Sequence, residues 1–197
     1  MRNSLAWPVA AVALALAACR TAPLPAPSAP PWPTRRPELQ AREHFELKGR
    51  VAVAAGTQGF NARLRWQQDG VRAQVALEGP LGAGAVHIDA QGSDLDIVMA
   101  SGAHLTSDAA RAELSARLGF DPPLASLRYW ILGVPDPAHP ADETLDPARQ
   151  RLTRLEQDGW RIDYGGYVVV GSEWLPARLT LERADVRVKL LVDDWQS

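Results

Sequence analysis

The sequence has few of the residues that most often carry covalent or metal chemistry. Its only cysteine is Cys19, so no disulfide can form within the chain. No histidine pair has the spacing of metal ligands among the four in the chain: His44, His87, His104 and His139. It contains neither a Gly-x-Ser-x-Gly motif nor a phosphate-binding glycine loop. Nothing in the sequence therefore predicts an enzyme, a catalytic residue, a metal or a cofactor.

Charge of one sign and long apolar runs are also missing. Lys and Arg number 21 against 23 Asp and Glu, without the basic excess expected of a nucleic-acid-binding surface. The apolar run over residues 9–18 is about half of the roughly 20 residues that a membrane-spanning helix needs. What is present is a hydrophobic fraction of 46%, sufficient for a core, and seven tryptophans, which suit cores and apolar binding surfaces.

The N-terminal residues have the pattern of a secretory signal. Arg2 precedes the short apolar run, and small residues precede the cysteine in Leu16-Ala17-Ala18-Cys19. This last stretch resembles the lipobox of bacterial lipoproteins, in which the chain is cut before a cysteine that carries lipid on its sulfur and on its new amine. We therefore expect a signal peptide over residues 1–18 and lipid attachment at Cys19. The alternative is an ordinary signal peptide that contains a cysteine.

A proline-rich segment separates the expected anchor from the rest of the chain. Residues 20–37 contain Pro23, Pro25, Pro27, Pro30, Pro31, Pro33 and Pro37. Proline fixes φ and removes a backbone donor, so we expect an extended, semi-rigid tether over residues 19–43 that is not part of the fold. A single domain then covers residues 44–197.

The domain is predicted to be mainly β with a helical insertion. Apolar and polar residues alternate, as in half-buried antiparallel strands, within about ten runs: 45–53, 60–66, 71–77, 86–90, 95–99, 152–155, 160–164, 168–170, 179–181 and 186–192. Helical spacing replaces alternation over 107–119 and from Pro122-Pro123 to Gly133, and 134–147 is expected to be a surface loop. We expect a strongly curved antiparallel sheet, or a partly closed barrel, with the helices across its open side.

Two stretches carry apolar residues whose role the pattern leaves open. In Gly79-Pro80-Leu81-Gly82 the glycine and proline positions suit a type I turn, which places Leu81 at the tip. Leu81 then either folds back onto its own domain or reaches into a bilayer or partner. The second helix has one apolar stripe, which is either plain core or a lid over a cavity for an apolar ligand: Leu124, Leu127, Trp130 and Ile131.

The two adjacent aspartates near the C-terminus, Asp193 and Asp194, do not indicate a paired-carboxylate site. Because they are adjacent on a strand, we expect their side chains to point to opposite faces of the sheet.

Several motifs in a fixed order carry a resemblance to a known family. After the lipobox come Leu47–Val51, Ala62–Trp66, Gly79–Gly82, Leu127–Pro135, Gly159–Tyr167, Leu175–Leu179 and Asp194-Trp195. Together they resemble the LolB family of outer-membrane lipoprotein receptors over about residues 44–195. The resemblance implies an unclosed β-barrel whose helices form a lid over a hydrophobic cavity. It also implies outer-membrane sorting, with which Arg20, in place of a retention aspartate, is consistent.

The resemblance further implies how the protein works. A LolA-like periplasmic carrier would hand over lipoproteins, whose acyl chains enter the cavity and are then released into the inner leaflet of the outer membrane. Leu81 occupies the family's membrane-contacting loop, and the helix stripe and Trp66 are candidates for the acyl cavity. We expect a monomer that faces the periplasm and binds no nucleic acid. The alternatives are a lipoprotein with a closed core that serves as an assembly or scaffold module, and a lipid hydrolase.

Overall fold

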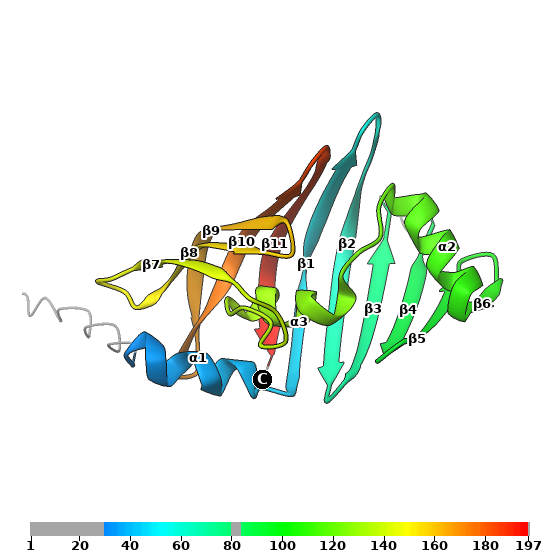
Figure 1. Ribbon diagram of the computed structural model, residues 1–197. Helices are drawn as coiled ribbons and strands as arrows, with labels where there is room; N and C mark the ends of the chain where they lie inside the picture. The colour runs from blue at the N-terminus through cyan, green and yellow to red at the C-terminus, as the bar shows by residue number, and fades with distance from the viewer. Residues whose placement is uncertain (1–29, 80–83, 197) are drawn as a thin grey trace, which may run out of the picture.

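Eleven strands and three helices make up the part of the chain that the computed structural model describes, residues 30–79 and 84–196 (Figure 1). The strands form one sheet, in the order β6-β5-β4-β3-β2-β1-β11-β10-β9-β8-β7, and every pairing is antiparallel. The strands are β1 (His44–Ala55), β2 (Gln58–Asp69), β3 (Arg72–Glu78), β4 (Val86–Gln91), β5 (Asp94–Met99), β6 (His104–Thr106), β7 (Asp142–Asp146), β8 (Arg151–Gln157), β9 (Trp160–Val170), β10 (Glu173–Arg183) and β11 (Val186–Gln196).

The predicted alternation sets which face of the sheet is buried. On β2, Ala62, Leu64 and Trp66 are buried while the two arginines between them are exposed. Trp66 pairs with Leu47 of β1 on one side and Val75 of β3 on the other. Since strand side chains alternate between faces, one face of the sheet becomes a continuous apolar surface. That face forms the core against the helices. The pairing of all strands into one sheet confirms the expected antiparallel sheet, and Figure 1 shows its curvature.

The sheet does not close into a barrel. Its edge strands, β6 and β7, each pair on one side only, so an open side remains between the two ends of the strand order. Two strands were not predicted: β6, and β7, which lies inside the segment 134–147 that was expected to be a loop. Two of the predicted runs, 160–164 and 168–170, belong to the single strand β9, so the count is eleven strands. Residues 134–136, at the start of that segment, are buried rather than on the surface.

Two helices lie over the apolar face, as the sequence predicts. Helix α2 (Ser107–Leu118) buries Ala110, Leu114 and Leu118 and packs against β5 and β6, while α3 (Leu124–Leu132) packs against β10. Each helix ends at a glycine with φ near +79°, Gly119 and Gly133, a left-handed conformation that suits glycine at a helix C-cap. Figure 1 shows α3 in front of the central strands and α2 beside β4–β6.

The prediction of an extended tether up to residue 43 is wrong for its last part. Residues Trp32–Gln40 form helix α1, which packs against α3 and buries Trp32, Arg35 and Leu39. Arg35 holds the helix in place, because its guanidinium contacts Glu173 at 3.1 Å and donates to the carbonyl oxygens of Gln150 and Trp174. The end of the tether is therefore part of the folded domain.

No helix in residues 30–79 or 84–196 is long and apolar enough to cross a membrane.

The two aspartates at the end of β11 do not point to opposite faces. Lys48 pairs with Asp194 and Gly49 with Val192, so Asp193 is an extra, bulged residue, and both aspartates are exposed. A β-bulge of this kind shifts the following residues by one position, which turns Trp195 into the core. Gly49 lies opposite the bulge, where a Cβ atom would collide with the Leu191 carbonyl oxygen.

Candidate functional site

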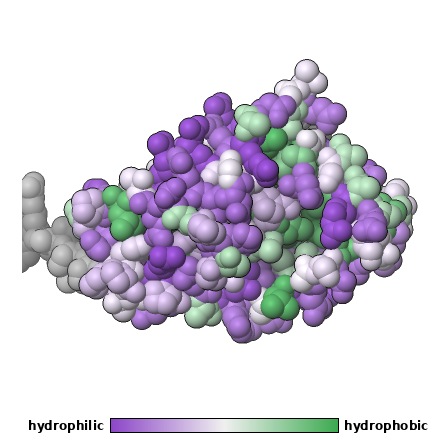
Figure 2. Space-filling model, in the orientation of Figure 1, coloured by the Kyte–Doolittle hydropathy of each residue, from purple (hydrophilic) through white to green (hydrophobic). Residues whose placement is uncertain are grey.

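An apolar cavity of about 110 Å³ lies between the sheet and the two helices α2 and α3. All of its lining residues are hydrophobic or proline. From the strands come Val51, Val53, Phe60, Leu64, Trp66, Val75, Leu77, Ile88, Trp160, Leu179, Leu181, Val188 and Leu190. From the helices and their linker come Leu114, Leu118, Phe120, Pro122, Pro123, Leu124, Leu127, Trp130 and Ile131. Figure 2 shows a hollow over the middle of the sheet in which hydrophobic residues gather.

The structure brings together the residues of the predicted helix stripe and Trp66. All five line the cavity: Leu124, Leu127, Trp130 and Ile131 from α3, and Trp66 from β2. Trp66, Trp130 and Ile131 are buried, whereas Leu124 and Leu127 are only half-buried. The helix stripe is thus both core and cavity wall, with its C-terminal half more deeply packed than its N-terminal half. Contact between this helix stripe and acyl chains stays a prediction.

Sequence reasoning did not find the residues that β9–β11 and the helix linker contribute. Leu179, Leu181, Val188 and Leu190 were recognised as strand residues but could not be assigned to a face, because a register shift of one residue exchanges the faces. Phe120 lies between the helices, where no periodicity exists. Its ring centroid is 5.6 Å from that of Trp160. The aromatic residues in the sequence indicated an apolar surface, but they did not indicate where each ring lies.

A buried amide holds the C-terminal end of α3 against the sheet. Gln157 of β8 accepts hydrogen bonds from Trp130 Nε1 at 2.7 Å and from the Asp136 backbone N–H at 2.9 Å. Its Nε2 donates to the carbonyl oxygens of Asp136 and His139, both at 2.9 Å. The hydrogen-bonding capacity of this amide is therefore used in full, and the network fixes the loop after α3.

Buried Tyr164 adds to the same attachment, and half-buried Tyr167 joins β9 to β8. Tyr164 donates from its hydroxyl to the Trp130 carbonyl oxygen at 3.1 Å, and Tyr167 donates to the Leu152 carbonyl oxygen at 2.8 Å. Burial raises the pKa of Tyr164 well above its ordinary value, and burial also raises the pKa of Tyr167. Both phenols therefore stay protonated near neutral pH, so they act here as neutral donors.

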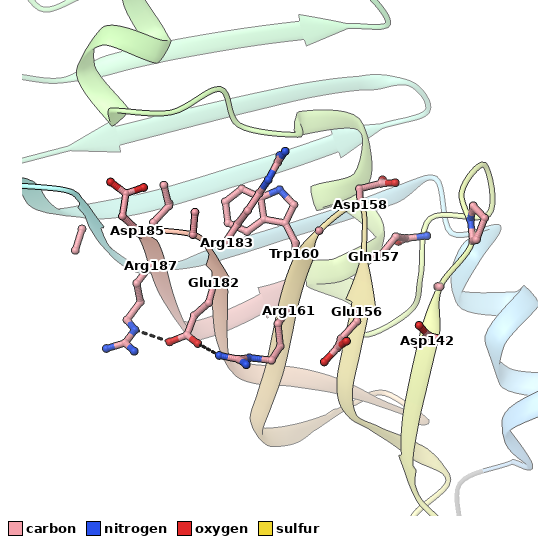
Figure 3. A pocket seen from close by; sticks show the side chains of 16 residues that line it. Asp142, Glu156, Gln157, Asp158, Trp160, Arg161, Glu182, Arg183, Asp185 and Arg187 are labelled. Atoms are coloured by element: carbon pink, nitrogen blue, oxygen red, sulfur yellow. Dashed lines mark hydrogen bonds and ion pairs between the residues drawn. The ribbon is translucent and has the colours of Figure 1, made fainter.

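A polar groove of about 1,000 Å³ lies at one end of the sheet, beside the turns that join β8 to β9 and β10 to β11 (Figure 3). On the outer side of the sheet Glu182 binds both Arg161 and Arg187, and these hydrogen bonds lower the pKa of the Glu182 carboxyl. On the other side the Arg183 guanidinium carbon lies 5.9 Å from the ring centroid of Trp160. Trp160 lines the apolar cavity as well as this groove.

The cavity is smaller than most ligand sites. Pockets for small molecules usually measure about 300–1,000 Å³, several times the 110 Å³ found between sheet and helices. The cavity is therefore small and partly open, and a long apolar ligand fits inside it only if part of the wall moves. Within the described residues, no three His, Cys, Asp or Glu side chains gather as metal ligands would.

Two of the predicted site residues lie outside the described part of the chain. Cys19, the expected lipid-attachment residue, precedes it, and Leu81 falls in the gap between residues 79 and 84. The strands on either side of this gap are described: β3 ends at Glu78 and β4 begins at Val86. The proposed roles of Cys19 and Leu81 therefore stay predictions.

Sequence comparisons relate this chain to one family over most of its length. The family model described as "Outer membrane lipoprotein LolB" matches residues 43–195. The outer-membrane lipoprotein LolB of Nitrosococcus oceani is 34% identical over 184 residues, which cover 92% of this chain and 92% of that protein. The protein of that name from Pseudomonas aeruginosa is 33% identical over 165 residues, covering 84% of this chain and 80% of the relative.

Solved structures share the fold at low sequence identity. A LolA superfamily protein from Nitrosomonas europaea superposes with a TM-score of 0.55 at 12% identity, covering 85% of this chain and 94% of that chain. A protein domain from Vibrio parahaemolyticus, described as a putative outer membrane lipoprotein-sorting protein, gives a TM-score of 0.52 at 9% identity, covering 84% and 90%. At such identities the likeness concerns the open sheet with its helices and nothing finer.

Proposed function

The chain belongs to the LolB family of outer-membrane lipoproteins, and we propose that it receives lipoproteins from a LolA-like periplasmic carrier and inserts them into the inner leaflet of the outer membrane. The observation that carries the proposal is the cavity between the sheet and α2 and α3, whose lining is entirely apolar. In this function the protein binds and releases its cargo without making or breaking covalent bonds.

The cavity wall supplies what the acyl chains of a lipoprotein need in the periplasm. Apolar surface in water costs about 25 cal/mol per Å², so exposed acyl chains would aggregate or bind elsewhere. A surface made of Leu, Ile, Val and aromatic side chains removes that cost without specific polar contacts. The polar part of the cargo then stays outside, in contact with solvent or with polar side chains at the rim.

Helix α2 and the linker over residues 119–123 are the part of the wall that moves to admit the chains. Helix α3 is attached through side-chain hydrogen bonds that include Trp130 to Gln157, and Arg128 to the Gly70 carbonyl oxygen. In the described chain α2 makes one side-chain hydrogen bond to another element, from Arg111 to the Ser93 carbonyl oxygen at 3.2 Å. Fewer polar contacts make α2 the easier element to displace.

Transfer without an energy source follows from a sequence of affinities. If the receptor binds acyl chains more tightly than the carrier, and the membrane more tightly still, each step of about 1.4 kcal/mol gives a tenfold bias forward. The receptor therefore needs an intermediate affinity. A cavity that must open before it binds has an intermediate affinity, because the free energy needed to open it reduces the free energy gained when the acyl chain is buried.

Lipid on Cys19 and the side chain of Leu81 complete the proposed machinery. Acyl chains on Cys19 would hold the protein at the outer membrane, since two or more chains anchor stably. Leu81 would enter the leaflet to which cargo is delivered, and the strands β3 and β4 that flank its loop also line the cavity, through Val75 and Ile88.

The proposal is tested by displacement of a fluorescent fatty acid from the full chain with Cys19→Ala, which carries no lipid of its own. A triacylated lipopeptide should displace the probe, and the same peptide without acyl chains should not. Leu127→Asp, which puts a charge into the cavity wall, should abolish probe binding. The matched control is Val98→Asp on β5, whose side chain is 42% exposed and outside the cavity, and it should bind like the parent. Failure of the lipopeptide to displace the probe refutes the proposed function.

A further inference from the structure

Trp160 is a buried indole whose N–H has no acceptor. Its side chain is 3% exposed, and Nε1 is shielded from solvent without a hydrogen-bond partner in residues 30–79 and 84–196. The two other tryptophans of the cavity wall are satisfied: Trp66 donates to Gln68 Oε1 at 3.0 Å and Trp130 to Gln157 Oε1 at 2.7 Å. A buried indole N–H usually finds a partner, so the orphan donor of Trp160 requires an explanation.

The position of Trp160 explains why its N–H has no acceptor within the protein. Its ring packs against Phe120 at 5.6 Å and Trp130 at 6.3 Å between centroids, within the apolar cavity. It also lines the polar groove at the end of the sheet, where Arg183 lies alongside it and Asp158 on the adjoining turn (Figure 3). Trp160 thus stands where the apolar lining ends and the charged lining begins.

An amphipathic ligand has a matching boundary in its own structure. The hydrocarbon part of a fatty acyl chain offers no hydrogen-bond acceptor, and its first acceptor is the carbonyl oxygen of the ester or amide that joins the chain to its head group. A chain that fills the apolar cavity and leaves its polar head in the groove would bring that carbonyl to the level of Trp160.

We propose that Trp160 Nε1 donates a hydrogen bond to the carbonyl oxygen of a bound fatty acyl ester or amide. Trp160 is then a specificity-determining residue: it distinguishes acyl chains from plain hydrocarbon and sets how deeply the chain lies. The inference rests on the proposed function, because it assumes that the cavity receives acyl chains. Lipoproteins and phospholipids share the carbonyl chemistry, so the experiment includes both.

The test compares two probes that differ in the carbonyl group. Methyl decanoate and undecane compete with the fluorescent fatty acid for the full chain with Cys19→Ala, and for the same chain with Trp160→Phe. Phenylalanine keeps an aromatic ring but has no donor, so the affinity for the ester should fall about three- to tenfold more than that for the hydrocarbon, the size of one neutral hydrogen bond. The control Trp66→Phe, which removes a satisfied donor from the same wall, should change both affinities equally.

A second measurement does not depend on how the variant folds. In the unsubstituted chain, the carbonyl stretching band of bound ester labelled with ¹³C should lie at lower frequency than in hydrocarbon solvent, because the carbonyl accepts a hydrogen bond. A triacylated lipopeptide and a diacyl phospholipid, each labelled at the acyl carbonyl, show which source gives the shifted band in the cavity.

The outcomes separate this inference from the proposed function. If the lipopeptide and both probes fail to bind, the proposed function is wrong. If the ester and the hydrocarbon bind and Trp160→Phe weakens them equally, with no shift of the carbonyl band, then acyl chains occupy the cavity but Trp160 does not recognise their carbonyl. If the carbonyl band shifts only when the phospholipid is bound, the hydrogen bond exists but its assignment to lipoprotein cargo is wrong.

Discussion

Filling the small apolar cavity should make the protein more stable and a poorer receptor at the same time. Val51 on β1 and Val75 on β3 both line the space of about 110 Å³, and isoleucine at each adds one methylene without changing the β-branched shape. Burial of a methylene contributes about 0.8 kcal/mol, so the double variant Val51→Ile/Val75→Ile should gain up to about 1.6 kcal/mol of unfolding free energy. In a core without spare volume, extra methylenes instead cost about 1–3 kcal/mol.

The same two methylenes occupy volume that an acyl chain would otherwise use. If they displace an equal amount of buried chain, the affinity for a fatty acyl probe falls by about 1.6 kcal/mol, or roughly fifteenfold. Urea unfolding and probe titration measure the two quantities on one sample. Val192→Ile is the control, because Val192 is buried on β11 but does not line the cavity, and it should lower stability while binding per folded molecule stays the same. A double variant that loses stability, or gains it without losing affinity, contradicts the interpretation of this space as the acyl site.

Three further outcomes are expected. Gln157→Leu should cost at least about 3 kcal/mol in urea unfolding, because it leaves the N–H groups of Trp130 and Asp136 and two carbonyl oxygens without partners in a buried site. Mass spectrometry of the mature protein should find a chain that begins at Cys19 with added acyl mass, and an unmodified cysteine would exclude the anchor. Leu81→Glu should fold and accept lipoprotein from the carrier but fail to insert it into liposomes, since a carboxylate resists the acyl region; normal insertion would rule out the membrane contact.

The strands and the cavity helices could be predicted because their signals are local. Alternation marks a strand with one buried face, and Gly119 and Gly133 mark the ends of α2 and α3. Which residues meet across the cavity could not be predicted, because that depends on register. The bulge at Asp193 illustrates the difficulty: one extra residue exposes both aspartates and brings Trp195 into the core, and no feature of the local sequence requires it.

Helix α1 was missed because tertiary contacts outweigh its composition. Pro31 at the N-cap and Pro33 in the first turn are compatible with a helix start, but Pro37 lies inside the helix and weakens it. What holds the helix is remote in sequence: the contacts of Arg35 with residues of β10 and of the turn before β8, and the burial of Leu39. A proline-rich segment read by itself shows none of these partners.

The attachment of α3 and the small volume of the cavity together bear on how cargo leaves. Trp130 is fixed through Gln157 and Tyr164, so in the proposed opening the wall formed by α3 keeps its place while α2 and the linker move. Closing behind a departing chain would restore the contact of Phe120 with Trp160, and this gain would offset part of the burial that the acyl chain loses. With such an opening, the affinity for acyl chains is expected to be lower than the apolar area alone would give. Variants that weaken the closed state should hold cargo more tightly and deliver it to membranes more slowly, whereas variants that fill the cavity should do the reverse.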